Sequence, residues 1–574
     1  MNFKGYGVSP GIAIGNIVIK KSFEYEITDK SVDSVKIAKK EFENILEKCR
    51  KDTKKLYEKM LKNSGKKEAQ IFQAHLMILK DPEFIDKVIS EIETSKKNIA
   101  FCLNKVSNEF ITMFENMDDE YLKQRALDIK DIKERLLKII FGYKEIENLE
   151  KENQIIVAKE LTPSDTAKLD LEKVKGFITE TGGETSHTAI MAKSLELPAI
   201  VGVKDIIKNI ENDKKIILDA STGEIIIDPT KKIINEYQLR KEKLKDFRNK
   251  LKEYKSQPTK TKDGKLIELA SNIGTFKDVE GCIKYGSEGI GLFRTEFLYM
   301  NSSDFPTEQE QFEIYKKVAK KMKNKPIIIR TMDIGGDKEL SYFDFPEEMN
   351  PFLGYRAIRM CLDKKDLFKI QLRAILRASY YGNIKIMFPM ISNLEELKEA
   401  KKVVDSVKIE LNKEDIKFDN NLEIGMMIEV PSAAIISDIL AKYVDFFSIG
   451  TNDLIQYTVA VDRMNENLKD LYNPLNPAIL RLINMVIKNG HKNDIWVGMC
   501  GEVAGNSDII PILLGMGLDE FSMSSINILK SRYLINNLSY KDMKNYSEEI
   551  LNCETIKEIE KNIQSLKDKL NLKF

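Results

Sequence analysis

From residue 266 to residue 524 the chain repeats one pattern, a short apolar segment followed by a longer segment with helical periodicity. The apolar segments occupy residues 266–272, 289–294, 327–333, 384–390, 424–430, 446–452, 496–500 and 521–524. Eight strands that alternate with helices predict a parallel sheet closed into a (β/α)8 barrel of the TIM type. Since such barrels carry their active sites at the carboxyl ends of the strands, the residues that end these segments are the first candidates for a functional site.

Polar or reactive side chains end several of these apolar segments. They are Arg294, Arg330, Glu429, Asn452, Asp453 and Cys500. Any one Arg or Glu is most often a solvated surface residue. A charge that follows an apolar strand into a barrel mouth needs a partner, however, and a bound anion or metal ion supplies one.

These charged residues suit a small phosphorylated acid. Arg294 and Arg330, with Arg463 further along the chain, offer fork-shaped donors that match phosphate and carboxylate oxygens. Glu429 and Asp453 are carboxylates on neighbouring strands, which suits Mg²⁺ rather than zinc. The alternative is general acid–base catalysis by the two carboxylates. We expect the nearby arginines to lower the pKa of both carboxylates, which favours the metal site.

The first 230 residues predict a separate α/β domain that is interrupted by helices. Strand-like segments occupy residues 5–19, 154–157, 176–178, 216–219 and 224–227, whereas residues 33–143 are rich in Lys and Glu with helical periodicity. We therefore expect a multidomain α/β protein. Its parts are an α/β domain (1–20 and 145–230), an inserted helical bundle (21–144), a charged linker helix (231–258) and the barrel (259–574).

His187 is one of only three histidines in the chain, and it follows the glycine pair Gly182 and Gly183. Residues 177–179 read as a strand, the glycines as a turn, and Thr185 or Ser186 as the N-cap of a helix. A helix N-terminus favours a phosphoryl group nearby, which suits a phosphohistidine intermediate. The alternative is that His187 is an ordinary cap or turn residue.

The segment GGETSHTAIMAKSLELPAIVG around His187 resembles the phosphohistidine signature of the phosphoenolpyruvate-utilising enzymes. The chain also contains GLFRTEFLYM, RTMDIGGDK, NPFLGYRAIR, EVPSA, FFSIGTNDLIQYT and VGMCGEVAG, in the order found in Enzyme I of the bacterial sugar phosphotransferase system. The resemblance covers nearly the full length. Glu184 departs from it, because the family usually carries Arg or an uncharged residue there.

The resemblance implies a role for each matching residue. The phosphoryl group of phosphoenolpyruvate would pass to His187, on a swivelling α/β domain, and pyruvate would be released. The residues expected to hold phosphoenolpyruvate are Arg294, Arg330, Asn452, Asp453 and Arg463, with Lys338 and Arg356 on the same basic rim. Glu429 and Asp453 would bind Mg²⁺. Cys500 would protonate the enolate of pyruvate, although a Cys between Met499 and Gly501 is more often a buried packing residue.

The resemblance also implies two protein partners. His187 would pass its phosphoryl group to a histidine of the phosphocarrier protein HPr, as the first step of sugar uptake, and the barrel would form a homodimer. The helical insert would dock HPr. Within it Ile71, Phe72, Leu76 and Leu79 repeat at helical spacing. We expect most of this apolar stripe to lie in the core of the bundle and an exposed subset of it to form the binding site. We expect His75 to be a contact or surface residue.

Composition adds three expectations. Lys+Arg of 91 against Asp+Glu of 90 leaves no overall charge to favour nucleic acid or membrane binding. The sequence contains no stretch of about 20 apolar residues, which points to a cytoplasmic protein without a membrane span. The six cysteines are scattered and should be free, mostly buried thiols, and His491 should be exposed in a polar loop.

Two other functions remain open on the sequence. A phosphoenolpyruvate synthase or pyruvate phosphate dikinase shares the histidine and the barrel, but it needs a nucleotide-binding domain ahead of the histidine. Only about 180 residues precede His187, and they contain no P-loop pattern. The second alternative is a regulatory binding module that has lost turnover, with Glu184 as the sign of that loss.

Overall fold

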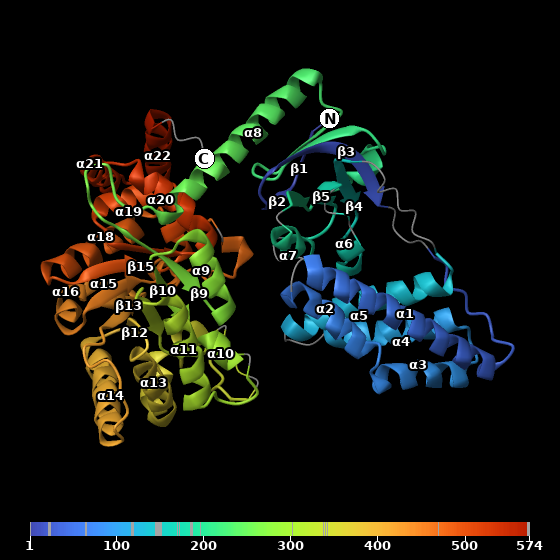
Figure 1. Ribbon diagram of the computed structural model, residues 1–574, viewed down its shortest axis with the longest axis horizontal. Coiled ribbons are helices and arrows are strands. Elements are labelled where there is room, and N and C mark those ends of the chain that lie inside the picture. Colours follow the sequence, from blue (N-terminus) through green and yellow to red (C-terminus); the bar gives the residue numbers. More distant parts are fainter. Residues whose placement is uncertain are drawn as a thin grey trace. The chain divides into compact units, whose positions relative to one another are not determined.

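The computed structural model describes residues 2–570 apart from 21–24, 64–65, 116–119, 144–151, 169, 171–172, 184–186, 196, 301, 337, 339, 341 and 469. The chain divides into two compact units, Met1–Phe247 and Arg248–Phe574 (Figure 1). The first unit combines an α/β part with a helical bundle, and the second is a barrel.

The α/β part of the first unit is built on an eight-stranded mixed sheet. Its strands are β1 (Asn2–Lys4), β2 (Tyr6–Ser9), β3 (Ile12–Lys20), β4 (Gln154–Ala158), β5 (Val174–Thr179), β6 (Ala199–Val201), β7 (Lys215–Asp219) and β8 (Glu224–Ile227), in the order β1-β8-β7-β3-β4-β5-β6-β2. Strands β3 to β6 are parallel. Every predicted strand of this part is present. The three-residue strands β1 and β6 were not predicted, because they are too short to carry a periodic signal.

The helical bundle is inserted between β3 and β4. It contains α1 (Val35–Asn63), α2 (Lys66–Ile78), α3 (Pro82–Ser95), α4 (Ile99–Glu115) and α5 (Glu120–Ile140). Their apolar faces form one core, in which Phe42, Val88, Leu103 and Leu136 are fully buried or nearly so. The predicted insertion of a helical bundle into an α/β fold is therefore confirmed.

A small apolar cluster joins the bundle to the α/β part. Phe72 of α2 and Met60 of α1 pack with Ala167 of α6 (Pro163–Lys168) and Met191 of α7 (His187–Ser194). Helix α7 is the one predicted to begin at His187, and it does begin there. The helix that carries His187 is thus anchored against the inserted bundle.

The second unit is a closed barrel of eight parallel strands, as predicted. The strands are β9 (Glu268–Ile273), β10 (Gly289–Arg294), β11 (Ile327–Arg330), β12 (Ile384–Phe388), β13 (Ile424–Ile428), β14 (Phe446–Ile449), β15 (Trp496–Met499) and β16 (Glu520–Met523), and β16 pairs with β9 to close the ring.

Helices connect these strands and lie around them (Figure 1). They are α9 (Val279–Tyr285), α10 (Glu296–Met300), α11 (Glu308–Met322), α12 (Ile358–Asp363), α13 (Lys365–Ser379), α14 (Leu394–Lys413), α15 (Pro431–Ile435), α16 (Ser437–Leu440), α17 (Thr451–Val459), α18 (Pro477–Lys492), α19 (Ile510–Met516) and α20 (Ile528–Asn536). Two further helices, α21 (Tyr540–Leu551) and α22 (Ile556–Leu570), follow the barrel.

Helix α8 (Lys231–Glu253) is the predicted linker helix. Only Tyr237 is buried along its length, which agrees with the expected solvated helix. Tyr237 donates a hydrogen bond to Glu224, and Arg240 lies 3.0 Å from Asp219, so the first half of the helix is fixed to the α/β sheet.

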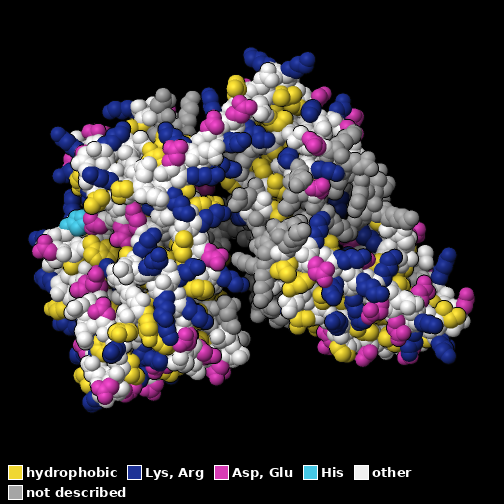
Figure 2. Space-filling model, in the orientation of Figure 1, with side chains coloured by type: hydrophobic (Ala, Val, Ile, Leu, Met, Phe, Trp, Pro, Cys, Tyr) yellow, Lys and Arg dark blue, Asp and Glu magenta, His cyan; other side chains and the backbone are white. Residues whose placement is uncertain are grey.

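On the face drawn in Figure 2, basic and acidic side chains are interspersed over both units. All six cysteines are free and buried. Among the described residues no helix is both long and apolar enough to span a membrane.

Candidate active site

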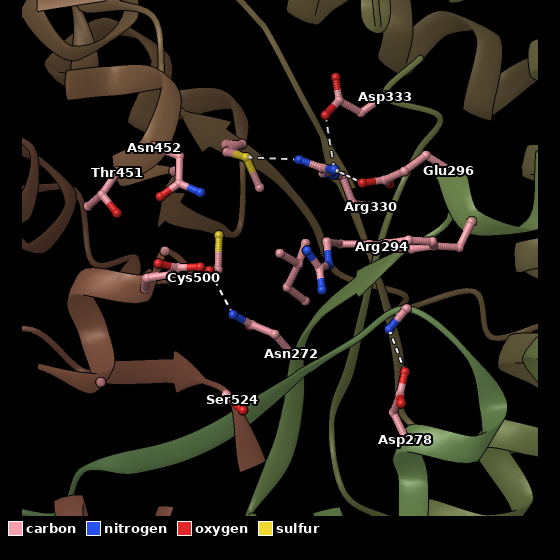
Figure 3. A pocket seen from close by; sticks show the side chains of 18 of the residues that line it. Asn272, Asp278, Arg294, Glu296, Arg330, Asp333, Thr451, Asn452, Cys500 and Ser524 are labelled. Atoms are coloured by element: carbon pink, nitrogen blue, oxygen red, sulfur yellow. Dashed lines mark hydrogen bonds and ion pairs between the residues drawn. The ribbon is translucent and has the colours of Figure 1, made fainter. Parts of the chain in front are cut away.

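The carboxyl ends of the barrel strands surround a cavity of about 1170 Å³. Every strand-end residue singled out from the sequence lines this cavity, and so do Lys338 and Arg463: the full set is Arg294, Arg330, Lys338, Glu429, Asn452, Asp453, Arg463 and Cys500. The barrel therefore brings together residues that are up to 206 positions apart in the sequence (294 to 500). Figure 3 shows Arg294, Arg330, Asn452 and Cys500 around the cavity.

Arg330, at the end of β11, is buried between two carboxylates (Figure 3). Its Nη2 atom lies 2.6 Å from Glu296 Oε1 and 2.9 Å from Asp333 Oδ2. Burial opposes the charge of Arg330, but Asp333 and Glu296 raise its pKa further above its usual range. Arg330 is therefore a permanent and immobile cation in the cavity wall.

Asp333 binds two further cations. Lys338 Nζ lies 2.6 Å from Asp333 Oδ2, and Arg356 Nη2 lies 2.9 Å from Asp333 Oδ1. Burial acts to raise the pKa of Asp333, but Arg330, Arg356 and Lys338 hold it well below its usual range. Arg356 is fully buried and does not line the cavity, so it lies behind the wall rather than on the expected basic rim. Its distance to Asp453 Oδ1 is 3.5 Å.

Arg294, at the end of β10, differs from Arg330 in its surroundings. Its side chain is exposed in the cavity, and its guanidinium stacks over the Phe297 ring at 5.2 Å. Its side chain makes no ion pair or hydrogen bond with another residue in the described part of the chain. An arginine that is held by a ring and has no bound carboxylate can accept an anion without breaking an internal ion pair.

Glu429, after β13, is almost completely buried, and its Oε1 accepts a hydrogen bond from the Met390 amide at 2.7 Å. The pKa of Glu429 is raised to about 8, first by burial and then by the negative charges of Asp453 and Asp333, which together outweigh Arg330 and Arg356. The expectation that arginines would lower this pKa was therefore wrong. The arginines nearest to Glu429 are already neutralised by Asp333 and Glu296, so burial and like charge decide the outcome.

The donor set fits a hard divalent cation that is shared with a substrate. Asp453 Oδ1 is buried and accepts no hydrogen bond from a described residue, although two arginines lie 3.5 and 3.7 Å away. Within the described residues no group of three or more His, Cys, Asp or Glu side chains could hold a metal alone. Two carboxylates plus water and substrate oxygens are the ligand set that Mg²⁺ usually takes.

Cys500, after β15, is buried at the inner end of the cavity. Its backbone amide donates to Ile449 O at 3.1 Å, and its carbonyl accepts from Asn272 Nδ2 at 2.9 Å. Asn272 is itself fixed by Ser522, whose hydroxyl donates to Asn272 Oδ1 at 2.6 Å. Burial raises the pKa of Cys500 to about 12, so its thiol is protonated at neutral pH. A buried, protonated thiol at a cavity wall can act as an acid.

The backbone of His187 begins α7, but residues 184–186 and the His187 side chain lie outside the described residues, as do the expected N-caps and Glu184. The first turn of α7 is held in place by Thr188, which donates to Leu161 O at 3.2 Å. Ala189 and Ala192 pack the helix against the sheet.

Comparison with known proteins agrees with this geometry. Family models of the phosphoenolpyruvate-utilising enzymes match the N-terminal domain over residues 4–125, the mobile domain over 150–223 and the PEP-binding domain over 248–540. The chain belongs to the phosphoenolpyruvate-utilising enzyme family. Its relatives in this family include the phosphoenolpyruvate-protein phosphotransferases of Bacillus subtilis (49% identity over 97% of this chain and 98% of the relative) and Priestia megaterium (48% over 97% of each). The relative of the same name from Mycoplasma capricolum is 48% identical over 99% of both chains.

Two charged residues that line the cavity were not predicted from the sequence, Glu296 and Asp333. Both lie inside segments that had been matched, GLFRTEFLYM and RTMDIGGDK. Their closeness to the predicted arginines was the available signal. Glu296 follows Arg294 by two residues and Asp333 follows Arg330 by three, so both had to lie near the same strand ends. Asn272 was also missed, and nothing in its strand sequence distinguishes it.

The other two histidines differ from expectation in one respect each, His75 in its burial and His491 in the element that carries it. His75 is fully buried, with Nε2 3.2 Å from Asp128 Oδ1 and Nδ1 3.9 Å from Asp131 Oδ2, so it is not a surface residue. A histidine facing two aspartates is buried at low cost, which the local sequence does not reveal. His491 is exposed as expected, but it lies in the last turn of α18 rather than in a loop, with Nε2 2.7 Å from Asp519.

Proposed function

We propose that this protein is a phosphoenolpyruvate-protein phosphotransferase. It transfers the phosphoryl group of phosphoenolpyruvate to its own His187 and then to a histidine of the phosphocarrier protein HPr, and it releases pyruvate. The observation that carries the proposal is the cavity at the barrel mouth, where the anion-accepting Arg294 lies near the fixed cation Arg330, two carboxylates and a protonated thiol. Full-length similarity to proteins of that name supports it.

Phosphoenolpyruvate would bind to Arg294, Arg330 and Arg463 through its phosphate and carboxylate oxygens. Asn452 and Asp453, in the first turn of α17, would complete the site. Because Arg330 cannot move away from Glu296 and Asp333, it would present its charge in a fixed place while the phosphoryl group is transferred. Lys338 and Arg356 would act by fixing Asp333, and Arg356 would also orient Asp453.

Mg²⁺ would be held by Glu429 and Asp453, together with substrate oxygens and water. When bound, it supplies a positive charge that offsets the charge of the transferring phosphoryl group. Glu429, whose pKa is about 8 without a cation, would release its proton on binding.

His187 would act as the nucleophile toward phosphorus, and the enolate that leaves would take a proton from Cys500. One histidine that serves both the barrel and the carrier protein requires a large domain reorientation, for which α8 is the candidate hinge. The exposed apolar side chains of the bundle, among them Leu61, Met77, Met113 and Leu127, would form the docking surface for HPr.

This mechanism requires the domain division proposed from the sequence, in which residues 231–258 link the part that carries His187 to the barrel. We also propose a homodimer through the barrel. Exposed apolar residues Ile435, Ile439 and Tyr443 around α15 and α16 support it.

Mass spectrometry after incubation with phosphoenolpyruvate and Mg²⁺ tests the function directly. We expect one phosphorylated residue, His187, with one pyruvate released per phosphoryl group, and no labelling of the His187→Ala variant. ATP should not replace phosphoenolpyruvate, whereas ATP turnover would favour a dikinase. Binding of HPr without pyruvate release would favour a regulatory module.

A further inference from the structure

A second carboxyl group, that of Glu520, lies inside the barrel. Glu520 begins β16 and is almost completely buried. Two glycines make room for it: a side-chain carbon added at Gly291 would come within 2.0 Å of Glu520 Oε1, and one added at Gly498 within 2.4 Å of Oε2. The Glu520 carboxyl therefore points into the barrel interior, toward β10 and β15.

The strand register places Glu520 beside Gly498, the residue two positions before Cys500 on the neighbouring strand. Gly498 pairs with Ser448 of β14 on one side and with Glu520 on the other. Paired residues of parallel strands face the same side of the sheet, so Ser448 and Glu520 face each other across the empty side-chain position of Gly498. Cys500 follows Gly498 by two residues and points to the same side.

The polar atoms of this row are not used within the described part of the chain. Ser448 Oγ and Glu520 Oε2 are both buried and have no hydrogen-bond partner there. Buried polar atoms without a protein partner are usually satisfied by ordered water, and such water conducts protons. Ser448 lies close to the Cys500 sulfur and acts to lower the pKa of the thiol, although no hydrogen bond is formed between them. A negative charge on Glu520 acts in the opposite direction and raises that pKa.

Glu520 carries a proton that it can give. Burial and the facing carboxylate of Glu268, its register partner on β9, raise the pKa of Glu520 well above its usual range, and Lys385 only partly offsets them. Glu268 and Lys385 are only partly buried, so they connect Glu520 to the amino end of the barrel. A neutral carboxylic acid in this position costs little to bury and is ready to donate.

We propose that Glu520 reloads Cys500 with a proton through Ser448 after each turnover. The inference rests on the proposed function. The Cys500 S–H bond breaks and its proton forms the new C–H bond of pyruvate, which leaves a thiolate. By way of water at the unpartnered atoms of Ser448 and Glu520, the Ser448 hydroxyl protonates the sulfur and takes the Glu520 proton in return. The Glu520 carboxylate then regains a proton from water by way of the amino end of the barrel. Glu520 acts through Cys500 and does not touch the substrate.

Comparing the rate of the first turnover with the steady-state rate distinguishes a proton relay from a structural role for Glu520. A relay is needed only after Cys500 has given up its first proton. In the full-length chain with Mg²⁺, phosphoenolpyruvate and a histidine phosphocarrier protein, pyruvate is followed by rapid quench. For Glu520→Gln we expect a first turnover within about twofold of wild type, because Cys500 is already protonated, and a steady-state rate lower by about 10-fold or more. Ser448→Ala should show the same split. Glu288→Gln, a carboxylate outside the row that binds the amides of Thr259 and Leu269, should leave both phases unchanged.

The possible outcomes are distinct. Equal slowing of both phases in Glu520→Gln, or no change in either, overturns the relay. If Glu520→Gln does not fold, Ser448→Ala decides: a wild-type steady state overturns the proposal. A wild-type protein that forms no pyruvate contradicts the proposed function itself, whereas an active wild type with unchanged variants contradicts only the relay.

Discussion

Arg330 Nη2 lies 2.9 Å from Asp333 Oδ2, and both side chains are almost fully buried in the wall of the barrel cavity. The pair is held from both sides, by Glu296 on the arginine and by Lys338 and Arg356 on the aspartate. The local charge is thus fixed before any ligand arrives.

Removing the cation should destabilise the barrel. Arg330→Met leaves Glu296 and Asp333 buried with one cation fewer, and we expect a loss of about 3 kcal/mol in the free energy of unfolding. Trp496, the single tryptophan of the chain, stacks on Phe446 inside the barrel, so its fluorescence during urea unfolding reports on this unit. The double variant Arg330→Met/Asp333→Asn should recover part of this loss in the free energy of unfolding, because it removes a buried charge that Arg330 no longer neutralises. An additive double variant would show that the two residues are not coupled.

The Mg²⁺ requirement for pyruvate formation should increase when Glu429 is replaced. Glu429→Gln removes one of the two proposed carboxylate ligands, and we expect the Mg²⁺ concentration for half-maximal pyruvate formation to rise by at least about 10-fold. Glu423→Gln, at the other end of the same strand, is the matched control. An unchanged Mg²⁺ requirement in Glu429→Gln would remove Glu429 from the metal site.

Loss of the Cys500 thiol should slow the protonation step. Cys500→Ala is expected to lower the rate of pyruvate formation by about 100-fold, because an acid positioned at the reacting carbon contributes on that order. Cys553→Ala, another buried thiol of the same unit, should leave the rate unchanged. A Cys500→Ala variant with wild-type activity would assign the proton to another group.

The joint between the bundle and the α/β part should depend on Asp131. Its Oδ2 accepts hydrogen bonds from the Ser164 hydroxyl at 2.7 Å and the Ser164 amide at 3.2 Å. Asp131→Ala leaves these buried donors unsatisfied, at a cost of about 1–3 kcal/mol. Hydrogen exchange in the full chain should show faster exchange in α6 and α2, whereas Asp86→Ala, on the exposed face of α3, should not. Unchanged exchange would mean that apolar packing alone holds the joint.

The stability of the barrel should fall with rising pH because of Glu520. Its pKa is raised above the unfolded value of 4.5, so the folded state holds the proton more tightly. The resulting stabilisation is complete at or below pH 4.5 and is lost as pH rises toward the folded pKa. Urea unfolding followed by Trp496 from pH 5 to 9 should show the wild type losing stability relative to Glu520→Gln as pH rises, because Gln cannot ionise in the unfolded chain. A difference independent of pH would contradict a protonated Glu520.

The local pattern was sufficient to predict the order of elements. Apolar segments of strand length alternate with amphipathic helices, and strand-end residues share one mouth in any closed parallel barrel, so Arg294, Glu429 and Cys500 could be placed together. The prediction worked because periodicity and chain direction act over short distances. It failed for β1 and β6 because three residues carry no period.

Other features depend on neighbours that are distant in sequence. His75 is buried because two aspartates of another helix face it. The pKa of Glu429 is raised by burial and by the charges of Asp453 and Asp333, which outweigh Arg330 and Arg356.

The sequence by itself determined the two-part architecture, the helix that begins at His187 and the gathering of charged residues at one end of the barrel, since each follows from periodicity and chain order. Only the tertiary structure decided which charges are paired, which are left to meet a ligand, and that Glu520 fills the space of two glycines beneath Cys500. Burial and electrostatic pairing are set by groups that the fold brings together from remote positions, and no local pattern encodes them.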